Sequence, residues 1–111
     1  MRKTVKLWKS INDSITRKRY IKELKYSDIK LNEYKIIDVR SRREFKEMHL
    51  NGSINIPFPE IKKEINKYVK NKDEKLLICC QSGIRSANAV SILDNLGYTE
   101  VYNLKNGIEN I

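Results

Sequence analysis

A cysteine in the C-terminal half of the chain stands in a setting that favours thiol chemistry. Cys80 ends an apolar run and opens the loop at residues 80–85, with the sequence CQSGIR. Gly83 permits a backbone conformation closed to residues with a Cβ atom, so successive N–H groups can turn towards one point. The start of a helix near Ser86 and the guanidinium of Arg85 add positive potential there. We expect this loop to hold the Cys80 sulfur as a solvent-accessible thiolate.

The electrostatic effect that such a loop must supply is modest. A free cysteine has a pKa near 8.5 and is only a few per cent ionised at pH 7. Each pKa unit corresponds to about 1.36 kcal/mol, so about two units of stabilisation leave a thiol mostly ionised. No histidine base is then needed, and the only histidine, His49, lies in a different segment. The alternative is that Cys80 is an inert cysteine at a strand end, since free cysteines are often buried.

The neighbouring Cys79 is expected to pack in the core. Successive side chains of a strand point to opposite faces of the sheet, which directs Cys79 away from the loop. Adjacent thiols are poorly placed to form a disulfide with each other, and two cysteines do not make the framework of a secreted mini-protein. Two adjacent cysteines and one distant histidine also lack the spacing and number of zinc ligands. We therefore expect no metal and no other cofactor.

The elements that must position the loop alternate between strand and helix. Strands are expected at residues 20–24, 35–39, 53–56, 76–79 and 100–104, and helices at 27–31, from 41, from 59 and at 86–96. Ser41 and Glu44 have the spacing of a capping box. Pro59 suits a first helical turn and Gly97 a helix C-terminus. Apolar stripes should face the sheet at Ile61, Ile65, Tyr68 and Val69 and at Ala87, Val90, Leu93 and Leu96. This order predicts a three-layer α/β domain, with a central, mostly parallel sheet of about five strands flanked by helices.

The size and composition of the chain fit one compact domain. It has 111 residues, of which 40% are hydrophobic and 33% charged. The longest apolar run, residues 76–80, is far shorter than the ~20 residues that cross a bilayer, so no transmembrane segment is expected. Lys6 and Lys9 interrupt the apolar residues near the N-terminus, which argues against a secretory signal. With the cysteine usage, these features favour a reducing, cytoplasmic location.

The positive charge is concentrated near the N-terminus. Of the formal net charge of +9, residues 1–30 supply +7, because they carry ten basic and three acidic side chains. We divide the chain into a basic extension, residues 1–19, and a domain, residues 20–111. The extension is interpreted first as a solvated or self-docked segment, with an anionic membrane, nucleic acid or a transit function as alternatives. A basic run gives non-specific attraction, so no specific nucleic acid partner is predicted.

Residues 21–108 resemble the rhodanese-like sulfurtransferase family in the order and spacing of four segments. These are IKEL, IIDVRSRREFKEMHLNGSINIP, CQSGIRSANAVSILDNLGY and VYNLKNGI. The Cys-x-x-Gly-x-Arg-Ser loop after an apolar strand is fairly specific, and it is joined by the Asp-Val-Arg and Asn-Ile-Pro segments. The resemblance implies a rhodanese-like fold. It also implies that Cys80 takes a sulfane sulfur from a donor such as thiosulfate, becomes a persulfide and passes the sulfur to a thiol or protein acceptor.

The resemblance implies roles for the rest of the loop as well. Arg85 would orient the oxygens of the donor, while the Ser82 hydroxyl and the loop backbone would supply further hydrogen bonds. Cys80 is thus the expected catalytic residue, and the expected substrate-binding residues are Gln81, Ser82, Gly83, Ile84 and Arg85. Four residues separate Cys80 from Arg85. By the same resemblance, phosphatases of this fold have five residues between the cysteine and the arginine, and this larger loop encloses a phosphate. The shorter loop favours sulfur transfer over phosphatase or arsenate reductase activity.

Some positions depart from the family pattern. Many members carry Arg or Lys directly after the cysteine, where this chain has Gln81, and this removes a charge that would attract thiosulfate. Asn106 replaces one of two paired glycines near the C-terminus, which should affect packing. Asp38, Arg40 and His49 match the family and are interpreted as structural residues.

A second class of function stays open from the sequence. The fold could serve as a non-catalytic docking or sulfur-relay module, with residues 1–19 engaging a protein, a membrane or RNA. The intact loop around Cys80 favours the enzyme.

Overall fold

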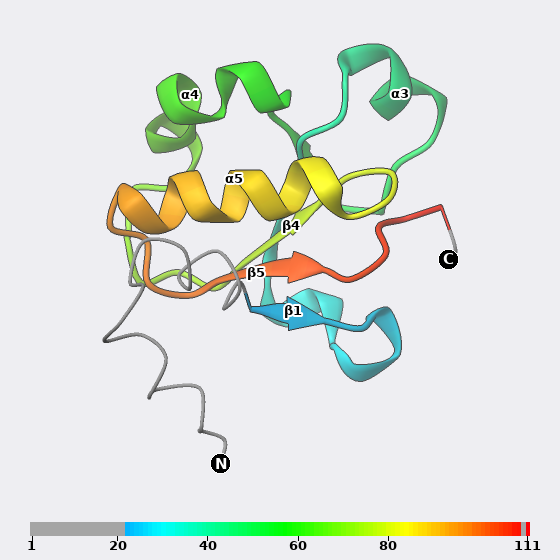
Figure 1. Ribbon diagram of the computed structural model, residues 1–111, viewed down its shortest axis with the longest axis horizontal. Helices are drawn as coiled ribbons and strands as arrows, with labels where there is room; N and C mark the ends of the chain where they lie inside the picture. The colour runs from blue at the N-terminus through cyan, green and yellow to red at the C-terminus, as the bar shows by residue number, and fades with distance from the viewer. Residues whose placement is uncertain (1–21, 110) are drawn as a thin grey trace, which may run out of the picture.

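The computed structural model describes residues 22–109 and 111, so the basic extension at residues 1–19 lies outside the described residues. The strands of the described part are β1 (Glu23–Leu24), β2 (Lys35–Asp38), β3 (Ile54–Asn55), β4 (Leu76–Cys79) and β5 (Val101–Leu104). They form one sheet in the order β1-β5-β4-β2-β3, and every neighbouring pair is parallel. The α/β architecture with a parallel sheet is therefore confirmed (Figure 1).

Strand β4 is the centre of the sheet and of the core. It pairs with β2 on one side and β5 on the other, and all four of its residues are buried. One apolar cluster, which contains Ile78 and Cys80, lies on the face covered by α4 and α5. The other cluster contains Leu77 and Cys79 on the opposite face, together with Leu104 and Ile108. Alternate residues of this strand thus serve opposite faces, and Cys79 is confirmed to point away from Cys80.

The helices of the described part are α3 (Arg42–Glu47), α4 (Ile61–Tyr68) and α5 (Ile84–Asn95), with 3-10 helices η1 (Tyr26–Asp28), η2 (Leu31–Glu33) and η3 (Phe58–Glu60). The capping box that starts α3 is confirmed. The Ser41 hydroxyl accepts from the Glu44 N–H at 3.1 Å, and the Glu44 carboxylate accepts from the Ser41 N–H at 2.9 Å. Figure 1 shows α5 lying across the sheet, where it packs on β4 and β5.

Three details of the expected helices were wrong. The segment expected as one helix at 27–31 forms two 3-10 helices instead. Helix α4 buries Ile61 and Ile65 but leaves Tyr68 44% exposed, because the helix ends there and the chain turns Val69 into the core. Helix α5 begins at Ile84, two residues early, because Gly83 turns the chain directly into it at a φ of 99°. Its buried face is Ser86, Ala89, Val90 and Leu93.

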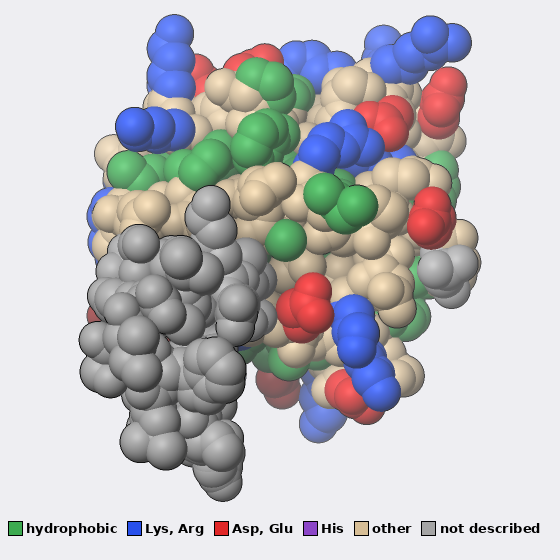
Figure 2. Space-filling view, in the orientation of Figure 1, with side chains coloured by type: hydrophobic (Ala, Val, Ile, Leu, Met, Phe, Trp, Pro, Cys, Tyr) green, Lys and Arg blue, Asp and Glu red, His purple; other side chains and the backbone are tan. Residues whose placement is uncertain are grey.

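The surface of the described part mixes charges of both signs. In the face shown in Figure 2, the Lys and Arg side chains alternate with Asp and Glu rather than gathering in one basic patch. This agrees with the near balance of basic and acidic residues beyond residue 30. No helix in residues 22–109 is both long enough and apolar enough to cross a membrane.

Candidate active site

The loop after β4 brings backbone donors to the Cys80 sulfur. The Gly83 N–H donates to Cys80 Sγ at 3.1 Å, and the Ser86 N–H donates to it at 3.3 Å. Gly83 is buried with φ at 99°, in the left-handed region that a residue with a Cβ atom rarely adopts. A Cβ there would also lie 3.1 Å from the Asn106 nitrogen. The expected cradle of N–H groups is therefore present, and Gly83 is needed to close it.

The sulfur inside this cradle is shielded from solvent. Cys80 is only 1% exposed and packs in the apolar cluster between the sheet and α5. The expectation that the Cys80 sulfur is accessible to solvent is thus wrong. The reason is that the amides enclose the sulfur closely while the core packs beneath it. A reagent could reach this sulfur only if the loop or its neighbours moved.

Arg85 is held by a partner that the sequence reasoning missed. Its guanidinium donates to the two Glu44 carboxylate oxygens at 3.0 and 3.1 Å, which joins α5 to α3. The Arg85 hydrogen bonds, followed by the Ser41 backbone N–H, lower the pKa of Glu44 from 4.5 to about 2. Glu44 in turn raises the pKa of Arg85 through its hydrogen bonds and its charge. The guanidinium expected to bind a donor is therefore already neutralised.

The side chains of the other expected loop residues lie at the surface. Gln81 and Ser82 are exposed, and Ile84 is 69% exposed. The loop thus brings Cys80 and Gly83 together and leaves these three side chains facing solvent.

The C-terminal segment supports the loop from behind. The Ile108 N–H donates to the Cys80 carbonyl at 3.0 Å, and the Glu109 N–H donates to the Gln81 carbonyl at 3.1 Å. A Cβ at Gly107, where φ is 66°, would lie 2.2 Å from the Gln81 carbonyl oxygen. Asn106 has a φ of 65°, a left-handed conformation that asparagine tolerates better than most residues. This turn therefore fixes the position of the loop backbone.

A buried polar chain behind the sulfur was also missed. Ser86 Oγ lies 3.2 Å from Cys80 Sγ and donates to Asn103 Oδ1 at 2.5 Å. Asn103 Nδ2 donates to the Gly83 carbonyl at 3.2 Å and to the Glu23 carboxylate at 3.0 Å. The signal available in the sequence was an asparagine inside an otherwise apolar strand, β5.

The residues that were interpreted as structural lie around the ends of β2 and α3. The Asp38 carboxylate is fully buried and accepts from the Arg40 backbone and guanidinium at 2.9 to 3.1 Å. His49 is exposed, stacks on Phe45 with ring centroids 3.8 Å apart, and lies 2.7 Å from the Phe45 carbonyl through Nδ1. Burial and the nearby Asp38 charge raise the pKa of the Cys79 thiol. Each of these contacts serves the scaffold, and none reaches the Cys80 sulfur.

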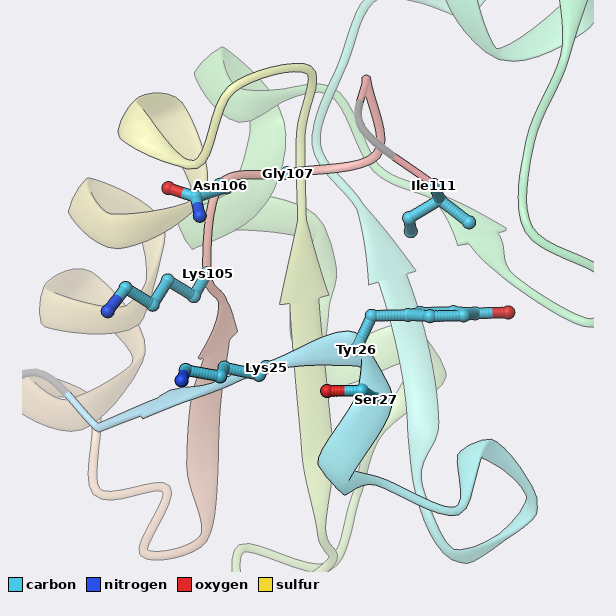
Figure 3. A pocket seen from close by; sticks show the side chains of 7 residues that line it. All are labelled: Lys25, Tyr26, Ser27, Lys105, Asn106, Gly107 and Ile111. Carbon is cyan, nitrogen blue, oxygen red and sulfur yellow. The ribbon is translucent and has the colours of Figure 1, made fainter.

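Two of the cavities lined by residues of the described part lie near the loop. One, of about 430 Å³, is lined by Arg85 and by Val39, Ser41, Arg42, Pro57, Phe58, Pro59 and Glu60. Its second arginine is also paired, since Arg42 donates to the Glu60 carboxylate at 2.6 Å. The other, of about 360 Å³, lies beside Gly107 and is lined by Lys25, Tyr26 and Lys105, among others. Figure 3 shows the two lysine side chains extending in the same direction, away from the Tyr26 ring. Only the first cavity includes a residue of the 80–85 loop.

Within the described residues, no group of three or more His, Cys, Asp or Glu side chains could hold a metal ion. The site is thus defined by a thiol, converging amides and paired charges at the carboxyl end of a parallel strand, where α/β domains bind their ligands.

The sequence and the fold place the chain in a known family. Residues 21–111 match the rhodanese-like domain, and the chain belongs to that family. A solved rhodanese-related protein from Thermoplasma volcanium superposes with a TM-score of 0.72 at 30% identity, over 80% of this chain and 88% of that one. The fold is therefore rhodanese-like.

Relatives of known name differ in activity. Thiosulfate sulfurtransferase PspE of Escherichia coli is 39% identical over 67 residues, which cover 60% of this chain and 64% of PspE. A tRNA uridine(34) hydroxylase of Acinetobacter baumannii is 38% identical over 78 residues, which cover 66% of this chain and 24% of the hydroxylase. The chain thus spans less than two thirds of the length of either relative. The chain therefore shares the rhodanese-like domain with proteins named for different activities.

Proposed function

We propose that the protein is a sulfurtransferase that carries a sulfane sulfur on Cys80 as a persulfide. The observation that carries the proposal is the convergence of the Gly83 and Ser86 N–H groups on Sγ. Such donors stabilise negative charge on Sγ, so they favour the thiolate nucleophile. No cofactor is required.

The reaction has two steps. In the first, the Cys80 thiolate attacks the outer sulfur of a donor such as thiosulfate. The new bond joins Sγ to that sulfur while the S–S bond of the donor breaks, and its electron pair leaves with sulfite. In the second step, a thiol, a protein or another nucleophilic acceptor attacks the outer sulfur, and the electron pair of the persulfide bond returns to Cys80. The protein begins and ends as the thiolate.

The shielding of the sulfur affects the two steps differently. Since Cys80 is 1% exposed, a donor reaches Sγ only after the loop or its neighbours move. In the persulfide, the reacting atom is the outer sulfur, about 2.05 Å from Sγ. Loading is therefore a step that depends on loop movement.

The binding residues offer little charge to a dianion. We assign substrate binding to Gln81, Ser82, Gly83, Ile84 and Arg85, acting mainly through backbone N–H groups. Gln81 is uncharged, and Arg85 is paired with Glu44. Thiosulfate is therefore expected to be a weak donor with a high KM.

The test is turnover of thiosulfate and cyanide to thiocyanate by the wild-type protein and two matched variants. Cys80→Ser is expected to abolish thiocyanate formation, because the persulfide cannot form. Cys79→Ser is the control, since Cys79 lies on the opposite face of the sheet. Equal loss from both variants, or no loss from either, would refute the assignment.

We also place the whole catalytic unit in residues 20–111, with residues 1–19 as an accessory extension. The match of the family to residues 21–111 supports this division. Deletion of residues 1–19 should leave kcat and KM for thiosulfate unchanged. Loss of turnover in a folded truncated protein would instead favour a docking or relay role in which the extension takes part.

A further inference from the structure

The Ser86 hydroxyl has one proton and two neighbours that could receive it. Its oxygen lies 3.2 Å from Cys80 Sγ and 2.5 Å from Asn103 Oδ1. Ser86 and Asn103 are fully buried and Cys80 nearly so, which leaves the choice of partner to the protein rather than to water. A serine hydroxyl donates one hydrogen bond and accepts through its lone pairs. Which neighbour takes the proton therefore decides what Ser86 offers the sulfur.

The orientation of the Asn103 side chain settles this choice. Its Nδ2 faces the Gly83 carbonyl at 3.2 Å and the Glu23 carboxylate at 3.0 Å, and both groups can only accept. A flipped amide would set two oxygens against its own oxygen, so Oδ1 must face Ser86. Because Oδ1 can only accept, the Ser86 proton must point towards Asn103.

We propose that Asn103 is a positioning residue that holds the Ser86 hydroxyl as a hydrogen-bond acceptor towards Cys80. In this orientation the Ser86 oxygen presents a lone pair to Sγ. A thiol can donate its S–H to that lone pair, whereas a thiolate is repelled by it. Asn103 therefore opposes the two N–H groups and favours the protonated form of the unloaded protein. The inference rests on the proposed function, in which Cys80 is the nucleophile.

The Ser86 lone pair destabilises the persulfide less than it destabilises the thiolate. Its negative charge lies mainly on the outer sulfur, while Sγ is bonded to two atoms and carries no formal charge. The Ser86 lone pair then faces a neutral sulfur, and its bond to Asn103 is kept. Asn103 thus disfavours the free thiolate while tolerating the loaded cysteine, which limits side reactions of the thiolate between turnovers.

Other charged or titratable groups lie on the surrounding elements. They are Asp38 at the end of β2, Arg40 after it, Glu44 on α3, Arg85 on α5, Glu23 on β1, the Cys79 thiol on β4, and Lys105 and Glu109 on the C-terminal segment. Asp38 is paired with Arg40, and Glu44 with Arg85. The Glu23 carboxylate accepts a hydrogen bond from Asn103, so the effect of its charge on Cys80 must be tested separately.

The test is the pH dependence of Cys80 alkylation by iodoacetamide, followed by peptide mapping and without any sulfur donor. Ser86→Ala should move the midpoint to lower pH, because the thiol loses its acceptor. Asn103→Leu should move it to lower pH by about one unit, because the freed Ser86 hydroxyl can donate to the thiolate; this is about a tenfold faster reaction at pH 6. A shift to higher pH in Ser86→Ala would show that Ser86 donates to the sulfur and would overturn the proposal.

A double-mutant cycle separates positioning from loss of structure. In the Ser86→Ala background, Asn103→Leu should shift the midpoint no further, since Asn103 acts through Ser86. An equal shift in both backgrounds would assign the effect to the loop and overturn the proposal. Glu23→Gln keeps an acceptor for Asn103 and should leave the midpoint unchanged; a shift as large as that of Asn103→Leu would assign the effect to charge. If Asn103→Leu does not fold, the direction in which Ser86→Ala moves the alkylation midpoint still decides for or against the proposal. Because no donor is present, these results do not depend on whether a persulfide forms.

Discussion

The Glu44 carboxylate is the joint between α3 and the loop that carries Cys80, and its removal should change how stability depends on pH. Oε1 accepts from the Ser41 N–H at 2.9 Å and from Arg85 Nη1 at 3.0 Å, while Oε2 accepts from Arg85 Nη2 at 3.1 Å. Glu44→Gln keeps the size of the side chain and one oxygen. It removes the negative charge and half of the bidentate pair.

The magnitude follows from the shift in the Glu44 pKa, from 4.5 to about 2. At 1.36 kcal/mol per pKa unit, the whole shift would correspond to roughly 3 kcal/mol of folding stability. The side chains of Glu44 and Arg85 are 33% and 41% exposed, so solvent screening reduces the contribution to about 1 kcal/mol. Because the folded pKa lies below the unfolded one, this stability is present above pH 4.5 and is lost as the pH falls towards 2.

Urea unfolding of the wild type and Glu44→Gln at several pH values measures this contribution. The variant should be less stable by about 1 kcal/mol at pH 7, and the two curves should converge between pH 4.5 and 2. The matched control is Glu60→Gln, which breaks the more exposed pair with Arg42 and should cost less. A difference that stays constant down to pH 2, or none at pH 7, would refute the reasoning. Glu44→Gln should also lower the KM for thiosulfate, because it frees Arg85 from its pair with Glu44.

Three further substitutions test the loop and its support. Gly107→Ala places a Cβ 2.2 Å from the Gln81 carbonyl, so turnover should fall at least tenfold and the melting temperature should drop; unchanged values would contradict the close approach. Gln81→Arg should lower the KM for thiosulfate severalfold without changing the free energy of unfolding, and an unchanged KM would show that charge does not limit binding. Asp38→Ala leaves the buried Arg40 charge unpaired and should cost about 3 to 5 kcal/mol in urea unfolding; a loss below about 1 kcal/mol would contradict this.

The local features of the site could be predicted from the sequence because they depend on neighbouring residues. An apolar strand followed by a cysteine and, three residues later, a glycine is enough to predict the amide cradle, and Gly83 has the positive φ that this requires. The capping box at Ser41 is equally local. Strand alternation likewise separates Cys79 from Cys80.

The features that were missed depend on contacts between distant segments. Arg85 and Glu44 are 41 residues apart, and their pairing follows from how α3 packs beside the start of α5. Asn103 reaches Ser86 because β5 pairs with β4 in a register that sets Asn103 opposite Ile78. The burial of Cys80 has the same origin, since it needs the packing of the whole core. Spacing along the chain contains none of this information.

The most direct test of the central claim is a mass spectrum of the protein after incubation with a sulfane sulfur donor and removal of the excess. The account predicts a gain of one sulfur atom, located in the peptide that contains Cys80, lost on treatment with cyanide and absent from Cys80→Ser. No added sulfur with thiosulfate or with a low-molecular-weight persulfide, or a sulfur located on Cys79, would contradict it.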